Sequence, residues 1–153
     1  MQKLFGMVRG SMLCARNTPI VSARQAIGWW EARRVPFNLI IGSAGIVSVA
    51  VVSVVGLGAA FLFNSDFGLP DPPLFALFGV IIYALVVNIC YTGGWIVEIA
   101  IRTVWPEQAD RFATLSLSLG LLLTILVTLL PGIVVGAAGI FGLVGHLLGV
   151  NPQ

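Results

Sequence analysis

Three long stretches of this sequence contain no Asp, Glu, Lys or Arg, and this limits the folds open to the chain. The stretches are Leu39 to Phe63, Leu74 to Thr92 and Phe112 to Val150. A helix made from the first stretch would be about 37 Å long, and the hydrocarbon core of a bilayer is about 30 Å thick. Only 9% of the residues are charged, whereas soluble domains have roughly a quarter. We therefore expect an integral membrane protein with lipid as the solvent for much of the chain.

Proline positions divide these stretches into the expected helices. Asp71-Pro72 has the pattern of a helix N-cap followed by a first-turn proline. The last stretch would be about 58 Å long as a single helix, so we expect it to break at Pro131-Gly132 and form a helical hairpin. The alternative is one kinked or re-entrant segment. The predicted fold is an all-α integral membrane protein, a four-helix transmembrane bundle with spans at about 39–63, 74–94, 112–130 and 132–150.

The region between the second and third spans is more polar. Helical spacing continues past Gly93-Gly94 to Trp105 and is amphipathic. This pattern favours a bend at the two glycines and a course along the membrane interface. Pro106 is expected to end this element, so that residues 106–111 make a short polar connection.

Residues 1–38 are a basic N-terminal segment, and residues 39–150 are the expected transmembrane domain. The segment has six Lys or Arg residues and one acid, Glu31, which gives a net charge of +5. Residues 19–35 are expected to form an amphipathic helix that ends before Pro36 and lies in the cytoplasmic membrane interface. Such a helix favours the lipid bilayer and its anionic headgroups as partners, and nucleic acid is not expected. The expected lipid-interface residues are Trp29, Trp30, Arg33 and Arg34.

Basic residues also predict the orientation, because the cytoplasmic flanks of membrane spans carry an excess of Lys and Arg. They precede the first span and recur as Arg102 and Arg111 between the second and third spans, but none lies in residues 64–73. The N-terminus is therefore expected in the cytoplasm, and four spans would return the C-terminus to the same side. We expect a bacterial inner membrane, with an organelle membrane as second choice because the basic start resembles a transit peptide.

Small residues recur at helical spacing in the first and last spans. Membrane helices place small residues where another backbone comes close. Packing within one chain and contact between subunits are both open, and the two can hold together. The expected packing or interface residues are Gly132, Gly136, Gly139, Gly142, Gly145 and Gly149 in the last span and Ser48, Gly56 and Ala60 in the first.

A polar stripe follows one side of the second helix. Asn88 lies deep in the apolar stretch, where an unpaired amide is costly, so we expect it to bond another helix, with hydroxyls such as Thr124 available. Glu98 and Arg102 are spaced for an ion pair within the helix. The stripe is expected to serve internal bonding or to form the wall of a polar pathway or partner groove. Its residues are Asn88, Tyr91, Thr92, Trp95, Glu98 and Arg102.

The functional expectation comes from the whole pattern, because no set of residues has the spacing of a catalytic, metal or cofactor site. His146 is the sole histidine, and zinc sites take three or four protein ligands. We expect no enzyme activity and no cofactor. The leading hypothesis is a multi-pass membrane protein that acts as an oligomeric or accessory subunit of a membrane complex. The alternative, based on the polar stripe, is a pore- or channel-forming protein such as a membrane-permeabilising effector.

Overall fold

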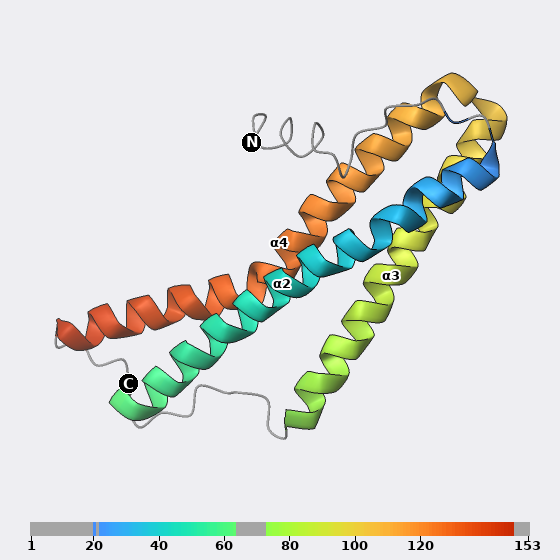
Figure 1. Ribbon diagram of the computed structural model, residues 1–153. Coiled ribbons are helices and arrows are strands. Elements are labelled where there is room, and N and C mark those ends of the chain that lie inside the picture. Colours follow the sequence, from blue (N-terminus) through green and yellow to red (C-terminus); the bar gives the residue numbers. More distant parts are fainter. Residues whose placement is uncertain (1–19, 21, 64–72, 149–153) are drawn as a thin grey trace. The chain divides into compact units, whose positions relative to one another are not determined.

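The computed structural model describes residue 20 and residues 22–63 and 73–148, and its secondary structure in these residues is helical. The helices are α2 (Ala23–Phe63), α3 (Pro73–Val104) and α4 (Pro106–Leu147), shown in Figure 1. All three are long and apolar enough to cross a membrane. The all-α expectation is confirmed, and the chain is compatible with membrane insertion.

The predicted count of four membrane helices is wrong for the described residues, because α4 continues through Pro131. The expected spans 112–130 and 132–150 are therefore parts of one helix, and the expected hairpin is absent from it. A proline removes one backbone donor, but a chain reversal inside an apolar region leaves several N–H and C=O groups without water. The sequence around Pro131, LLPGIV, has no polar side chain to replace that water.

The expected end of a separate interfacial helix at Pro36 is also wrong, because α2 runs through this residue into the first apolar stretch. The helix begins with a capping box formed by Ser22 and Gln25. The backbone N–H of Gln25 donates to Ser22 Oγ at 3.3 Å, and the N–H of Ser22 donates to Gln25 Oε1 at 3.3 Å. These bonds satisfy two donors at the helix start. Residue 19, where the sequence predicts the start of this helix, lies outside the described residues.

Pro106 begins a helix instead of opening a polar connection. Trp105 alone separates the end of α3 from the start of α4, and residues 106–111 form the first turns of α4. A proline is well placed at the first helical position, where its missing N–H has no partner to lose. The α-helix of α3 also passes Gly93-Gly94 without interruption. The predicted N-cap at Asp71 lies outside the described residues.

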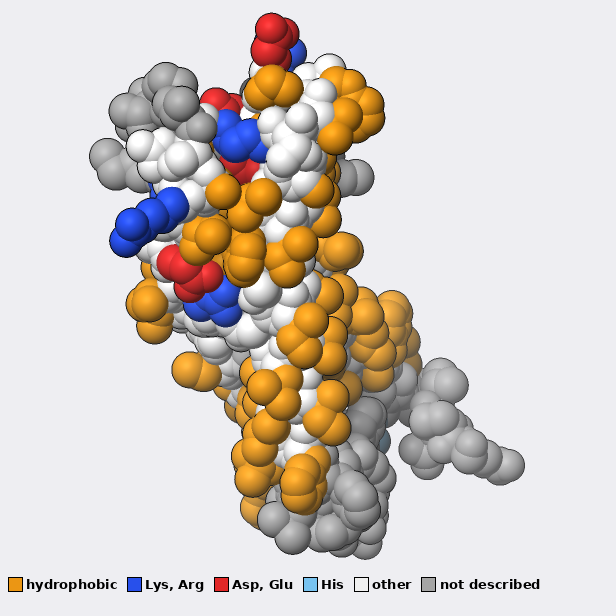
Figure 2. Space-filling model, turned by 90° about the vertical axis from the view of Figure 1, so that its right-hand side faces the viewer, with side chains coloured by type: hydrophobic (Ala, Val, Ile, Leu, Met, Phe, Trp, Pro, Cys, Tyr) orange, Lys and Arg blue, Asp and Glu red, His pale blue; other side chains and the backbone are white. Residues whose placement is uncertain are grey.

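The helices pack as two units, each built from parts of more than one helix. Of the described residues, unit 1 contains those up to Ile40 and from Ile81 to Thr124, and unit 2 contains those from Ile41 to Val80 and from Ile125 onward. Every described Asp, Glu, Lys and Arg belongs to unit 1. On the face drawn in Figure 2, charged side chains gather in one region and hydrophobic side chains cover a large part of the rest.

The two units have different cores. Unit 1 buries large side chains, including Trp30, Phe37 and Leu117, whereas unit 2 buries Ile41 and smaller residues such as Ser48 and Ala59. Large apolar side chains of unit 2 point outward, and Phe61 is 87% exposed. Exposed apolar surface of this extent is typical of a chain surrounded by lipid or by other apolar partners. The division of the chain at residue 38 into two domains stays a prediction.

Candidate functional site

Unit 1 contains a buried carboxylate, Glu98 of α3, with 0% of its surface exposed. The indole N–H of Trp30 donates to Glu98 Oε2 at 2.7 Å, and Arg102 Nη2 donates to Glu98 Oε1 at 2.6 Å. The ring of Trp30 reaches this position because it lies on Gly94. A Cβ atom on Gly94 would be 2.7 Å from Trp30 Cη2, so the glycine makes room for the indole.

Arg102 links Glu98 to α4 and to the chain just before α2. Its Nη2 also donates to Asp110 Oδ1 of α4 at 2.6 Å, and its Nη1 donates to the carbonyl oxygen of Ile20. Two carboxylates therefore share one guanidinium, with a formal charge of −1. Burying the charges of Glu98 and Arg102 is costly unless they are paired and hydrogen-bonded, as they are in this arrangement. The set Trp30, Glu98, Arg102 and Asp110 is called the clamp below.

A second polar layer joins α2 and α3 beside the clamp. The hydroxyl of Tyr91 donates to the carbonyl oxygen of Trp30 at 2.6 Å, and Arg34 Nη2 donates to Thr92 Oγ1 at 3.1 Å. The amides of Asn38 and Asn88 bond each other in both directions, at 3.2 and 3.0 Å. Five of the six residues in the predicted stripe thus have hydrogen bonds within unit 1.

Trp95 is the stripe residue with a different environment. Its side chain is half-buried, and its indole nitrogen has no hydrogen-bond partner within the part of the chain that the structure describes. The expected hydroxyl partner of Asn88 also differs. Thr124 Oγ1 donates to the carbonyl oxygen of Gly120 in its own helix at 2.7 Å, and Asn88 pairs with Asn38 instead.

Trp30, Asp110 and Asn38 are the site residues that sequence reasoning missed. Trp30 was expected at the lipid interface, but it is 2% exposed and packs inside unit 1. Asp110 was expected in a connecting segment, and Asn38 at the end of the basic N-terminal segment. Their polar atoms next to apolar stretches are a signal for buried hydrogen bonds, but spacing along the chain does not indicate which helices pair.

Three expected lipid-interface residues, Trp29, Arg33 and Arg34, are half-buried in unit 1. The Arg33 guanidinium lies 4.0 Å from the Trp29 ring centroid, a distance typical of a cation–π contact. Arg34 forms an ion pair of 2.7 Å with Glu31. Charged side chains on the first turns of α2 thus include Arg33, Arg34 and Glu31.

Three of the predicted glycines pack tightly against α2 in unit 2. A Cβ atom on Gly132 would be 3.0 Å from Ser48 Cα, one on Gly136 would be 3.2 Å from a Val51 methyl, and one on Gly139 would be 2.5 Å from a Val55 methyl. The N–H of Gly132 also donates to Ser48 Oγ at 3.0 Å. The first half of the glycine stripe thus lies at a close contact between two helix segments.

The other small residues have different surroundings. Around Gly142 nothing lies within 4 Å of a Cβ position, Gly145 is half-buried, and Gly149 lies outside the described residues. Each three-residue step turns a stripe by about 60° around the helix, so Gly145 faces about 120° away from Gly139. On α2, Gly56 is buried and Ala60 is exposed, while its neighbour Ala59 is buried.

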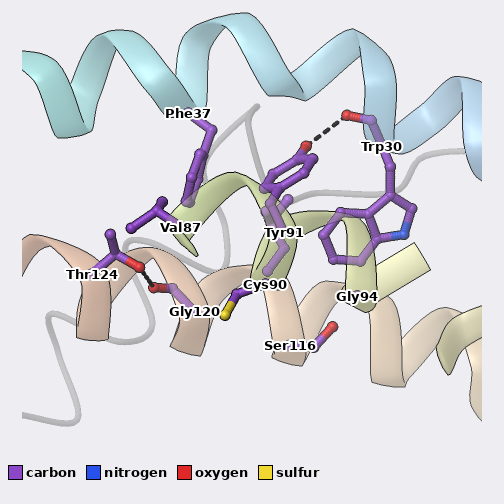
Figure 3. A pocket seen from close by; sticks show the side chains of 10 residues that line it. Trp30, Phe37, Val87, Cys90, Tyr91, Gly94, Ser116, Gly120 and Thr124 are labelled. Atoms are coloured by element: carbon purple, nitrogen blue, oxygen red, sulfur yellow. Dashed lines mark hydrogen bonds between the residues drawn. The ribbon is translucent and has the colours of Figure 1, made fainter. Parts of the chain in front are cut away.

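A cavity of about 160 Å³ lies in unit 1, next to the clamp. Its walls include Trp30 and Phe37 of α2, Tyr91 of α3, and Leu117 and Gly120 of α4. Figure 3 shows the aromatic side chains and the glycines around it. The aromatic rings brace one another, with centroids 5.2 Å apart for Trp30 and Tyr91 and 4.7 Å apart for Phe37 and Tyr91.

Among the residues that the structure describes, no three His, Cys, Asp or Glu side chains come together as a metal site would need. His146 lies exposed in the last turn of α4. No protein-family model matches this chain, and comparisons with curated proteins and with solved structures find no significant match.

Proposed function

We propose that this protein is a non-enzymatic, multi-pass membrane protein that serves as a subunit, assembling with copies of itself or within a larger membrane complex. The supporting observation is a set of open glycines in the helices of unit 2. Around each, nothing lies within 4 Å of a Cβ position; they are Gly42, Gly58, Gly79 and Gly142.

A glycine inside a helix lowers the stability of the helix, and close packing of another helix against the glycine can offset this loss. Glycine costs a helix about 1 kcal/mol relative to alanine in water. At Gly132 and Gly139 a close contact with α2 accounts for the glycine. At Gly142 no contact within the described chain does so. Membrane helices use small residues where another helix approaches, so a helix of a second subunit is the partner that Gly142 and its neighbours favour.

The proposed setting is a bacterial inner membrane, with the basic N-terminus in the cytoplasm. Arg24, Arg33 and Arg34 lie on the first turns of α2, where anionic headgroups are the expected partners. If each of the three apolar helices crosses once, the two ends of the chain lie on opposite sides. The C-terminus is then outside the cytoplasm, unlike in the four-span prediction.

The proposal is tested by measuring the mass of the protein particle in mild detergent. We expect the wild-type particle to exceed the mass of one chain, either through self-association or through co-purifying protein. Gly142→Leu should reduce the excess, because the larger side chain blocks the approach of a second helix. Gly28→Leu is the matched control, since Gly28 is also open but lies in the charged first turns of α2. A strictly monomeric wild-type particle without co-purifying protein would contradict the proposal.

A pore-forming function has less support than subunit assembly. It requires several chains to turn the polar stripe of α3 toward a shared lumen. In the described structure Asn88 bonds Asn38, and Glu98 bonds Trp30, so opening a lumen would break bonds within the chain. Liposome flux distinguishes the two functions: subunit assembly predicts no leak at high protein loading.

A further inference from the structure

The cavity of unit 1 has the size of a small apolar ligand. Its volume is about 160 Å³, and a dry, apolar cavity of about 150 Å³ in a protein interior is able to hold benzene. Gly120 leaves part of this space open, because nothing lies within 4 Å of its Cβ position. By contrast, the space beside Gly94 on α3 is already occupied by the Trp30 ring. Packing of the described residues therefore leaves room for a further group beside Gly120.

The polar atoms of the cavity wall are already hydrogen-bonded within the chain. The hydroxyls of Tyr91, Ser116 and Thr124 donate to backbone carbonyls at 2.6, 3.2 and 2.7 Å. A buried water molecule needs two to four polar partners, and these donors are engaged elsewhere. The wall therefore favours an apolar occupant over water.

The cavity reaches the outer surface of α3. Cys90 lines it and is exposed, whereas Leu117 on the inner wall is 2% exposed. Ile89 and Val86 beside Cys90 are 68% and 51% exposed, so the surface around the opening is apolar. In a membrane, acyl chains cover such a surface.

We propose that this cavity binds the end of a lipid acyl chain, which enters from the surface of α3 beside Cys90. The inference rests on the proposed membrane location, because only a membrane supplies acyl chains at that surface. The acyl chain contacts the Trp30 and Tyr91 rings and fills the space beside Gly120. It thereby packs against the same indole that donates to Glu98.

Photo-crosslinking of the full chain tests the site directly. The protein is placed in phosphatidylcholine and phosphatidylglycerol vesicles in which some lipids carry a diazirine on an acyl chain, and labelled residues are identified by mass spectrometry. Three leucines of α4 provide matched positions: Leu117 is 2% exposed and lines the cavity, Leu119 is 55% exposed, and Leu121 is 4% exposed and does not line it. We expect labelling at Leu119 and Leu117 but not at Leu121.

The three positions separate failure of this inference from failure of the membrane proposal. Labelling of Leu119 without Leu117 overturns the acyl-chain site but remains consistent with the membrane location. This result is expected if another copy or another part of this chain fills the cavity. Absence of label at all three contradicts the membrane location. Equal labelling of Leu117 and Leu121 overturns the site, because it indicates general opening of the helices.

A pair of glycine variants provides a second test. Gly120→Leu places a side chain in the cavity and should reduce the labelling of Leu117 to the level of Leu121. Gly93→Leu is the matched control, since nothing lies within 4 Å of its Cβ position and it does not line the cavity. It should leave Leu117 labelled, and equal losses in both variants would overturn the site.

Discussion

Glu98 illustrates, at the scale of single residues, how a charge is accommodated inside an apolar bundle. Each of its carboxylate oxygens accepts a hydrogen bond, one from Trp30 and one from Arg102. Arg102 in turn bonds Asp110 on α4. The ion pairs of Arg102 therefore join α3 to α4 as well as connecting two turns of α3. Removing a single member leaves the others buried without full pairing, which costs more than the loss of an exposed ion pair.

We expect Glu98→Ala to lower the free energy of unfolding by about 3–5 kcal/mol, because it leaves the Trp30 donor unpaired and weakens the pairing of Arg102. Unfolding of the purified protein in detergent, followed by circular dichroism, measures the change. Glu31→Ala is the control: Glu31 forms an ion pair with Arg34 at 2.7 Å, but its side chain is 45% exposed. Its loss should cost at most about 1 kcal/mol. Equal effects of the two variants would show that the clamp does not hold unit 1 together.

At the scale of helices, the two units are held together by different contacts: hydrogen bonds between side chains in unit 1 and close backbone approach in unit 2. In unit 1, α2 and α3 meet through polar pairs such as Asn38 and Asn88. In unit 2, α2 and α4 meet through backbone proximity at Gly132, whose neighbour Pro131 stays inside the helix. Both arrangements satisfy buried polar groups while the surrounding surface remains apolar.

Gly132→Ala should destabilise the protein by about 1–3 kcal/mol, because its Cβ would press against backbone and force the two helices apart. The atom it meets is Ser48 Cα, at 3.0 Å, which cannot rotate away as a side chain can. Gly93→Ala is the comparison, since its Cβ meets nothing within 4 Å and the proposed subunit contact does not involve it. It should be neutral or stabilise the helix by up to about 1 kcal/mol. Unfolding in detergent measures both, and a larger loss for Gly93→Ala would contradict the observed packing of the helices.

At the scale of the whole molecule, the number of membrane crossings determines where the chain ends lie. The helix α4 is about 63 Å long at 1.5 Å per residue, twice the thickness of a hydrocarbon core. Because α4 is one continuous helix, we expect it to cross the core once. If each of the three apolar helices crosses once, the number of crossings is odd.

We therefore expect the two ends of the chain to be labelled from opposite sides of the membrane. In a Cys90→Ala background, the natural Cys14 reports on the N-terminal side, and a cysteine added after Gln153 reports on the C-terminal side. A membrane-impermeant maleimide on intact cells should label the added cysteine, whereas Cys14 should react only after permeabilisation. Protection of both cysteines in intact cells would indicate an even number of crossings and contradict a single crossing by each of the three helices.

Much of this architecture follows from the sequence alone, for a simple physical reason. Uncharged stretches such as Leu39 to Phe63 are too long for a small soluble core, and in lipid only internally bonded structure is favourable. Helical periodicity then places Asn88, Glu98 and Arg102 on one side of α3 without knowledge of the fold. The pairing of Glu98 with Arg102 is local and could also be predicted.

The tertiary structure decided what spacing along the chain does not encode. Trp30 and Asp110 became partners of the α3 stripe because three helix segments meet in unit 1. Pro131 remained helical because its surroundings are too apolar to solvate a turn. Of the glycines on α4, Gly132 and Gly139 lie in a close contact with α2, whereas Gly142 has nothing near its Cβ position. These outcomes depend on which helix faces meet, and the sequence of one helix does not specify its neighbour.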